Sequence, residues 1–317
     1  MTTTVNELAF VFPGQGSQSV GMLADAFEQF PVVRGTFDQA SEVLGLNASE
    51  LALSGPQQQL NRTEITQPLL LCASVALWRV WCELSEQRPG WLAGHSLGEY
   101  SALVCAEALS FEDALGLVQL RGQLMQAAVA EGEGAMAAIL GLDDAQVEQA
   151  CEQACEGAQS VSAANYNSPG QVVIAGHAAA VERAIVLAKD AGAKRAMALA
   201  VSVPSHCELM RPAAEQLADT LANTEFAACK IPVIHNVDVS PAGRASDIRQ
   251  RLAQQLHSPV RWSDSVQYLA SQGVTTLAEC GPGKVLSGLA RRIDRNLSGV
   301  ALEPPADLQD LANSQQT

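Results

Sequence analysis

A serine between two glycines, in the segment GHSLG at 94–98, most constrains how this chain of 317 residues can fold. The apolar residues 91–93 predict a short strand before it, and a helix is expected from Glu99 onward. This order is typical of a nucleophile elbow, a tight turn that exposes the serine hydroxyl above a sheet. The glycines would leave room where the strand and helix backbones crowd the turn, and helix amides would stabilise an oxyanion. Ser96 is therefore a candidate nucleophile, with a plain Gly-Ser turn as the alternative.

Short apolar runs and helical segments alternate along the rest of the chain, which predicts an α/β fold. Residues 8–12 (LAFVF) end at a Pro-Gly pair and predict a buried strand. Residues 67–82 are apolar nearly all round and predict a buried helix. Further strands are expected at 231–236 and 275–279, whereas the polar tail beyond Pro304 is expected to be frayed.

The pattern changes between about residues 134 and 202. Strand, helix, strand, strand, helix and strand are predicted there in turn, at 135–142, 144–154, 161–166, 171–175, 178–191 and 195–203. The order βαββαβ is the ferredoxin-like arrangement. We therefore expect a ferredoxin-like small domain at 131–202, inserted into a discontinuous core formed by 1–130 and 203–317.

The net charge of −15 argues against a protein that binds nucleic acid or an anionic membrane. An acidic ligand or partner would need a local basic patch. The candidate residues for such a patch are Lys189, Lys194, Arg195, Arg291, Arg292 and Arg295. Each of them could equally belong to a solvated charged face.

No apolar run approaches the roughly 18 residues of a membrane span, and no basic segment precedes the apolar run near the start. A soluble, cytoplasmic protein is expected. The eight cysteines include no Cys-x-x-Cys pair and no cysteine–histidine cluster with zinc-ligand spacing. They are interpreted as reduced structural thiols, and no metal site is predicted.

A serine hydroxyl needs a base to act as a nucleophile at neutral pH, and the chain has five histidines. His95 adjoins Ser96, and neighbours on an elbow point apart. His177 lies in the predicted small domain, while His235 falls within a predicted strand and His257 follows a helix. His206 ends a strand-to-loop segment downstream of the serine, where α/β folds present catalytic groups. It is the candidate base, although a structural histidine is an equal alternative from position alone.

An oxyanion would need two backbone amides near Ser96. The amide of Leu97, directly after the serine, is one natural donor. The second is expected from Gln15, which stands between Gly14 and Gly16 in a loop after the first strand. A dinucleotide-binding loop is the competing interpretation, but Ser19 stands where its third glycine should be.

Arg121 lies in the apolar stripe of a helix predicted from Ser110 to about Ala128. A guanidinium stays charged and is costly to bury without an anion. An internal Asp or Glu partner, or a side chain that reaches out to solvent, would be the structural explanation. The functional one is a two-pronged clamp for a substrate carboxylate, which beside a serine nucleophile suggests an acyl group such as malonyl.

These motifs together resemble a known family, the bacterial malonyl-CoA:acyl-carrier-protein transacylases. The likeness runs in the same order from about residue 8 to 290. It rests on the segments FVFPGQGSQSVGM, ITQPLLLCASVALW, AGHSLGEYSALVCA, VSVPSHCELM, QLHSPVRW and ECGPGKVL. The chain is also similar to the acyltransferase domains of polyketide and fatty-acid megasynthases.

The resemblance implies an α/β-hydrolase-like core around the small domain, with a role for each of eight residues. Ser96 would be the acylated nucleophile, His206 the base, Gln15 and Leu97 the oxyanion amides, Arg121 the carboxylate clamp, Asn165 and His95 cleft-lining residues, and Gln255 the residue whose main-chain carbonyl orients the histidine. The carbonyl takes the place of a triad acid.

The resemblance implies transfer of malonyl from malonyl-CoA to the phosphopantetheine thiol of acyl carrier protein, by ping-pong kinetics and without metal or bound cofactor. A serine hydrolase or thioesterase would use the same dyad but pass the acyl group to water. An acyltransferase subunit of a malonate decarboxylase would load a different carrier. A non-catalytic carrier-binding module is disfavoured by the full set of reactive groups. A monomer is expected, because no oligomerisation segment is recognisable.

Overall fold

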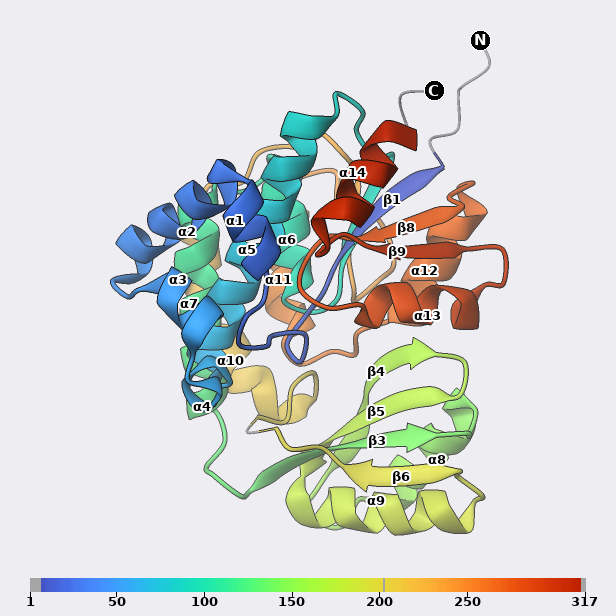
Figure 1. Ribbon diagram of the computed structural model, residues 1–317. Coiled ribbons are helices and arrows are strands. Elements are labelled where there is room, and N and C mark those ends of the chain that lie inside the picture. The colour runs from blue at the N-terminus through green and yellow to red at the C-terminus, as the bar shows by residue number, and fades with distance from the viewer. Residues whose placement is uncertain (1–6, 202, 315–317) are drawn as a thin grey trace.

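A computed structural model describes residues 7–201 and 203–314 and contains two β-sheets with different topologies. The larger sheet has five strands and is entirely parallel, and the smaller has four antiparallel strands. Figure 1 shows the small sheet and the helices beside it below the larger part of the molecule. The predicted combination of an α/β core with a small antiparallel domain is confirmed.

The parallel sheet has the strand order β7-β2-β1-β8-β9. Its strands are β1 (Leu8–Phe12), β2 (Trp91–Gly94), β7 (Val233–Ile234), β8 (Thr276–Glu279) and β9 (Ser298–Ala301). Every residue of β1 is buried, which explains its unbroken apolar sequence, since helices cover both faces of a parallel sheet. Phe10 and Phe12 pack on one side, whereas Ala9 and Val11 pack on the other.

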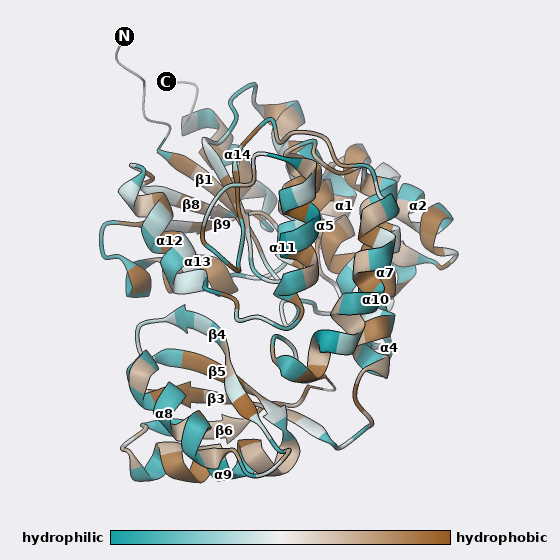
Figure 2. Ribbon diagram, turned by 180° about the vertical axis from the view of Figure 1, so that it is seen from behind, coloured by the Kyte–Doolittle hydropathy of each residue, from teal (hydrophilic) through white to brown (hydrophobic). Residues whose placement is uncertain are grey.

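Two helical layers enclose this sheet. The elements outside the small sheet are α1 (Ala24–Gln29), α2 (Pro31–Leu44), α3 (Ala48–Ser54), α4 (Gln57–Leu60), α5 (Thr63–Leu84), α6 (Gly98–Cys105), α7 (Phe111–Ala127), η1 (Glu208–Met210), α10 (Arg211–Asn223), α11 (Ala245–Gln255), α12 (Trp262–Ser271), α13 (Val285–Ile293) and α14 (Pro305–Ser314). Helices α5 and α7 belong to the core on the phenylalanine side of β1, while α12 and α13 cover the other side. In Figure 2 α11 is largely teal, and only its inward residues Ile248, Leu252 and Gln255 are buried.

Helix α5 is the single helix in the described ranges that is long and apolar enough to cross a membrane by length and composition. Its most apolar 18-residue window is 78% buried inside the protein. It packs against α2 and α7 as a core helix, as the all-round apolar sequence predicted.

The small sheet has the order β4-β5-β3-β6, which is the ferredoxin-like topology predicted from the sequence. Its elements are β3 (Gly134–Leu140), α8 (Asp144–Ala154), β4 (Val161–Ser168), β5 (Gln171–His177), α9 (Ala178–Asp190) and β6 (Arg195–Ala198). They enclose a separate hydrophobic core. The expected domain boundaries at 131 and 202 stay a prediction.

The small sheet is joined to the rest of the molecule through Val260, which precedes α12. The Val260 amide donates to the carbonyl of Ala164 at 2.9 Å, and the Tyr166 amide donates to the carbonyl of Val260 at 3.0 Å. These bonds extend the edge of β4 with a short parallel bridge. They fix β4 beside the segment that follows Gln255.

Three details of the expected elements differ from the structure. The strand predicted at 195–203 ends at Ala198, because the chain leaves the sheet there to reach His206. The strand predicted at 231–236 is only Val233–Ile234. The expected fraying beyond Pro304 is wrong for residues 305–314, which form α14 with Leu308 and Ala312 buried one turn apart. Residues 315–317 of that tail lie outside the described ranges.

Candidate active site

Ser96 lies on a tight turn between β2 and α6, as the motif predicted. Its φ of 54° is in the left-handed region, which is unusual for a residue with a side chain. A Cβ atom added at Gly94 would lie 1.8 Å from the carbonyl carbon of Gly98, and one added at Gly98 would lie 2.0 Å from the carbonyl oxygen of Phe12. The expected crowding of strand and helix at the two glycines is therefore present.

Asn236 holds this strained turn from the end of the neighbouring strand β7. Its Oδ1 accepts a hydrogen bond from the Ser96 amide at 2.7 Å, and its Nδ2 donates to the Gly94 carbonyl at 2.7 Å. Two backbone groups that the tight turn leaves without regular partners are satisfied in this way. Asn236 was not predicted from the sequence, because an asparagine after a short strand carries no distinctive pattern.

Ser96 and His206 meet directly. The Oγ of Ser96 lies 2.7 Å from Nε2 of His206, and Nδ1 of His206 lies 2.8 Å from the main-chain oxygen of Gln255. Because a carbonyl oxygen can only accept, Nδ1 carries the proton and Nε2 presents its lone pair to the serine hydroxyl. The structure thus brings together Ser96 and His206, the predicted nucleophile and base, with Gln255, whose main-chain role the resemblance implied.

His206 is almost completely buried, with 3% of its surface exposed. Burial, followed by the positive charge of Arg121, lowers the pKa of His206 to about 3. The hydrogen bond to Gln255 acts in the opposite direction but is the smaller effect. The imidazole is therefore neutral at physiological pH and able to accept a proton.

Arg121 reaches the same hydroxyl from helix α7. Its Nη2 donates to the Oγ of Ser96 at 3.1 Å and to Oε1 of Gln255 at 3.0 Å, while Nη1 donates to Oε1 of Gln67 at 2.8 Å. The residue is 1% exposed, so it does not reach out to solvent. In the described part of the chain it forms no ion pair with a carboxylate. A side chain that reaches solvent is therefore excluded, and no Asp or Glu of the described residues pairs directly with the guanidinium.

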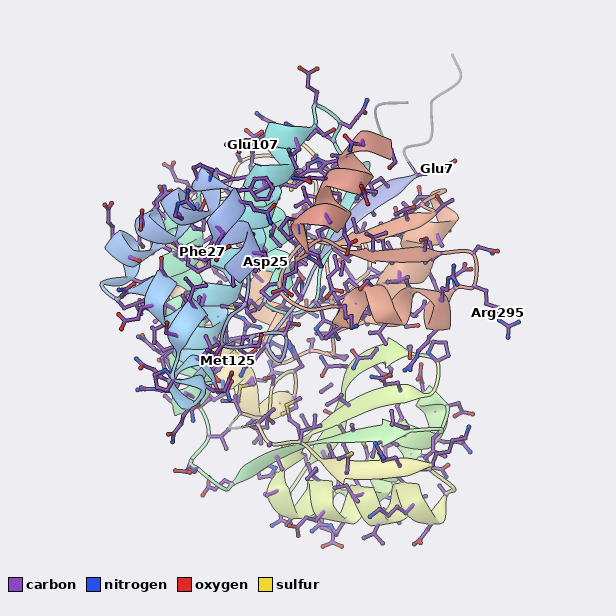
Figure 3. All side chains as sticks on the ribbon, viewed as in Figure 1. Glu7, Asp25, Phe27, Glu107, Met125 and Arg295 are labelled. Atoms are coloured by element: carbon purple, nitrogen blue, oxygen red, sulfur yellow. The ribbon has the colours of Figure 1, made fainter. Side chains whose placement is uncertain are left out.

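A cavity of about 260 Å³ lies over these groups, between the core and the small sheet. Seven of the eight predicted site residues line it, namely Gln15, His95, Ser96, Leu97, Arg121, Asn165 and His206. Gln255 lies behind His206 and is fully buried. Met125 of α7, labelled in Figure 3, also forms part of the cavity wall. The oxyanion roles of Gln15 and Leu97 stay predictions.

His95 connects the elbow to the small sheet. Its Nε2 lies 2.9 Å from Oδ1 of Asn167, which must accept, and its ring lies against Trp262. Burial lowers the pKa of His95. Asn167, two residues beyond the predicted Asn165 on β4, also lines the cavity and was not predicted from the sequence. Alternation along β4 could have indicated it, since both residues then share one face of the strand.

The described residues contain no group of three or more histidine, cysteine or acidic side chains that could hold a metal ion. The eight cysteines are all free thiols, and five of them are buried.

Comparison with known proteins shows which family this chain belongs to. Residues 9–298 match the model of the acyl transferase domain. The malonyl CoA-acyl carrier protein transacylase of Salmonella typhimurium is 56% identical over 304 residues, which cover 96% of this chain and 98% of that protein. The protein of the same description from Escherichia coli K12 is 57% identical over 302 residues, covering 95% and 97% of the two chains.

Solved structures agree with this assignment. The crystal structure of an acyl carrier protein S-malonyltransferase from Vibrio cholerae has a TM-score of 0.94 and 58% identity, covering 96% of this chain and 99% of that one. A malonyl-transacylase in complex with a type II polyketide synthase acyl-carrier protein has a TM-score of 0.96 and 54% identity, covering 97% and 99%. This chain belongs to the acyl transferase domain family and, within it, to the malonyl CoA-acyl carrier protein transacylases.

Proposed function

We propose that this chain transfers a malonyl group from malonyl-CoA to the phosphopantetheine thiol of acyl carrier protein, through a malonyl ester of Ser96. The observation that carries the proposal is the position of one hydroxyl between a neutral imidazole at 2.7 Å and a buried guanidinium at 3.1 Å. The first group activates the nucleophile, and the second suits an acyl group that ends in a carboxylate. The reaction supplies extender units for fatty acid biosynthesis.

In the first half-reaction the Oγ of Ser96 attacks the thioester carbonyl while Nε2 of His206 accepts the hydroxyl proton. The developing oxyanion would be stabilised by the amides of Gln15 and Leu97. When the carbon–sulfur bond breaks, His206 returns the proton to the leaving sulfur, and coenzyme A departs as a thiol. The carbonyl of Gln255 keeps the imidazole in the required tautomer throughout.

The second half-reaction reverses these roles with a different thiol. The phosphopantetheine thiol of the carrier gives its proton to His206, and the sulfur attacks the malonyl ester. The ester carbon–oxygen bond breaks, and Ser96 regains its proton from His206. Each proton and each bond is handled by a side chain of this site or by the two substrates, so we propose no metal or bound cofactor.

The carrier protein would approach the mouth of the cavity. Because the net charge of this chain is negative, docking of an acidic carrier there would need a local patch of basic residues. All six basic residues that could form a local patch are exposed. Arg292 contacts a cavity-lining residue, since its Nη1 donates to Oε1 of Gln171 at 3.3 Å. Arg295 points outwards from the segment between α13 and β9 (Figure 3). Arg292 is therefore the first basic residue to test for carrier docking.

We further propose a cytoplasmic monomer that binds neither nucleic acid nor membrane.

A transferase and a hydrolase differ in the fate of the acyl enzyme. We expect the malonyl enzyme to persist in water and to lose its acyl group only when carrier protein bearing phosphopantetheine is added. Carrier protein without phosphopantetheine is the matched control and should leave the acyl enzyme intact. Spontaneous loss of malonyl at the same rate with and without the charged carrier would favour a thioesterase.

A further inference from the structure

A buried carboxylate lies directly behind the nucleophile elbow. Glu99 stands three residues after Ser96, in the first turn of α6, and only 1% of its surface is exposed. It accepts hydrogen bonds from Nδ1 of His235 at 2.5 Å, from the Asn236 amide at 3.0 Å and from Nε2 of Gln255 at 2.9 Å. Glu99 is not among the residues that line the cavity, so it would not touch the substrate. A buried carboxylate is costly, and three donors on one carboxylate indicate a specific use.

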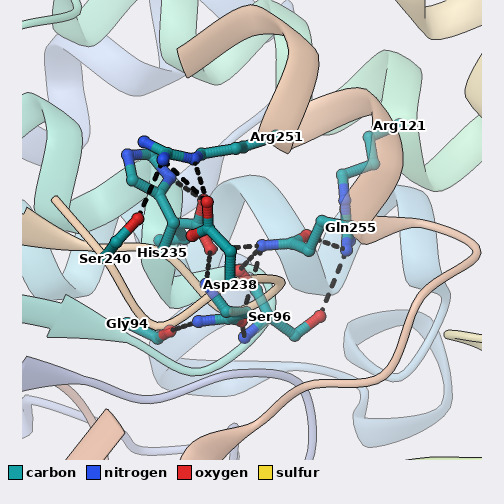
Figure 4. Close-up of polar contacts among 10 residues, drawn as sticks. Gly94, Ser96, Arg121, His235, Asp238, Ser240, Arg251 and Gln255 are labelled. Carbon is teal, nitrogen blue, oxygen red and sulfur yellow. Dashed lines mark hydrogen bonds and ion pairs between the residues drawn. The ribbon is translucent and has the colours of Figure 1, made fainter. Parts of the chain in front are cut away.

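Gln255 connects this carboxylate to the arginine, and Figure 4 shows its contact with Arg121. Its Nε2 donates to Glu99, and its Oε1 accepts from Nη2 of Arg121 at 3.0 Å. A carboxylate can only accept and a guanidinium can only donate, so the amide between them has a single favourable orientation. The Glu99 carboxylate, together with the main-chain carbonyl of Ser96 that accepts from the same Nε2 at 3.0 Å, thereby fixes which end of the Gln255 amide faces Arg121.

Glu99 also supplies negative charge close to an otherwise unpaired cation. Burial lowers the pKa of Arg121, and Tyr100 followed by the charge of Glu99 opposes that effect. A carboxylate in direct contact would occupy the guanidinium and compete with a substrate carboxylate. A carboxylate one amide away can stabilise the cation and leave room for that substrate.

We propose that Glu99 is a positioning residue for the malonyl clamp, acting on Arg121 through the side-chain amide of Gln255. In this arrangement Glu99 holds the guanidinium beside the Oγ of Ser96 without neutralising it by direct contact. The inference rests on the proposed function and extends it to the choice of acyl group. It concerns the side chain of Gln255, which is separate from the main-chain carbonyl that orients His206.

The test compares malonyl-CoA with acetyl-CoA as donors to carrier protein. In Glu99→Gln, the ratio of kcat/KM for malonyl to kcat/KM for acetyl should fall by about tenfold, because the buried negative charge that supports Arg121 through the Gln255 amide is lost. Glu107→Gln, which removes an exposed carboxylate paired with Lys230 after the same helix, is the matched control and should keep the wild-type ratio. If Glu99 had a purely structural role, Glu99→Gln would lower kcat/KM for malonyl-CoA and for acetyl-CoA equally. That result would overturn the proposal.

A double-mutant cycle tests the route through Arg121. In an Arg121→Ala background, Glu99→Gln should change the ratio by less than about twofold, because the group that it positions is gone. A further loss of about tenfold in that background would contradict the route. If Glu99→Gln does not fold, Gln255→Met removes the bridging amide but keeps the main-chain carbonyl, and an unchanged ratio there also overturns the proposal. Failure of the proposed function is recognised separately, since wild-type enzyme would then transfer no malonyl.

Discussion

Arg121 donates a hydrogen bond from Nη2 to the Oγ of Ser96 at 3.1 Å, so the cation adjoins the nucleophile itself. The same hydroxyl lies 2.7 Å from Nε2 of His206. A carboxylate bound to the guanidinium would therefore hold the rest of a short acyl group close to the attacking oxygen. Arg121, which would select the acyl group, and His206, which would activate the nucleophile, therefore contact the same hydroxyl on one wall of the cavity.

Removal of the guanidinium should affect a carboxylate-bearing substrate most. We expect Arg121→Ala to lower kcat/KM for malonyl-CoA on the order of 100-fold, because a buried charge-assisted pair is lost. The loss with acetyl-CoA should be much smaller. Arg79→Ala, which removes an arginine bonded to Thr36 and Gln39, is a suitable control. Steady-state kinetics with malonyl-CoA and acetyl-CoA measure the loss of kcat/KM for each donor. Equal losses would disprove the role of Arg121 in binding the substrate carboxylate.

The low pKa of His206 predicts an unusual pH profile. A base with a pKa of about 3 is about 99% neutral at pH 5, so protonation of His206 should not slow Ser96 acylation between about pH 5 and pH 8. An ordinary histidine would lose about 30-fold at the acid end of that range. Because the charge of Arg121 helps to lower this pKa, Arg121→Ala should move the acid limb to higher pH when acetyl-CoA is the donor. Stopped-flow measurements of the acylation rate against pH test this prediction. An acid limb near the ordinary pKa of histidine in the wild-type profile would contradict it.

Gly98 should be irreplaceable for steric reasons. A Cβ atom there would lie 2.0 Å from the carbonyl oxygen of Phe12, so Gly98→Ala should cost more than about 4 kcal/mol or prevent folding. Gly116 is exposed within α7, and a Cβ atom added there would have no neighbour within 4 Å. Gly116→Ala should therefore stabilise the protein by about 0.5–1 kcal/mol. Thermal unfolding of both variants measures the difference, and similar melting temperatures would refute the crowding at the elbow.

The main site residues could be predicted because each belongs to a recognisable local sequence pattern. Ser96 stands in a fixed glycine pattern, and Arg121 is a cation in an apolar stripe. The order βαββαβ is likewise visible as changes in hydrophobic period. His206 was the candidate among five histidines from its strand-to-loop position, with a structural role as an equal alternative, and the resemblance to a family was needed to assign it as the base and to identify the carbonyl of Gln255.

The supporting residues could not be predicted in the same way, since their roles depend on contacts between distant segments. Asn236 reaches the elbow across 140 positions, and Gln255 reaches Glu99 across 156. Glu99 did carry a signal, as the one charged residue of the largely buried helix α6. The helix α14 was missed because its buried face consists of few residues, among them Leu308 and Ala312, in a polar background.

The most direct measurement is intact-mass analysis of the protein after mixing with malonyl-CoA, followed by peptide mapping. We predict that the wild-type chain gains the mass of one malonyl group on the peptide that contains Ser96, that charged carrier protein removes it, and that Ser96→Ala gains nothing. A malonyl adduct of unchanged yield in Ser96→Ala, or one mapped to another residue in the wild type, would contradict the assignment of this hydroxyl as the acyl acceptor.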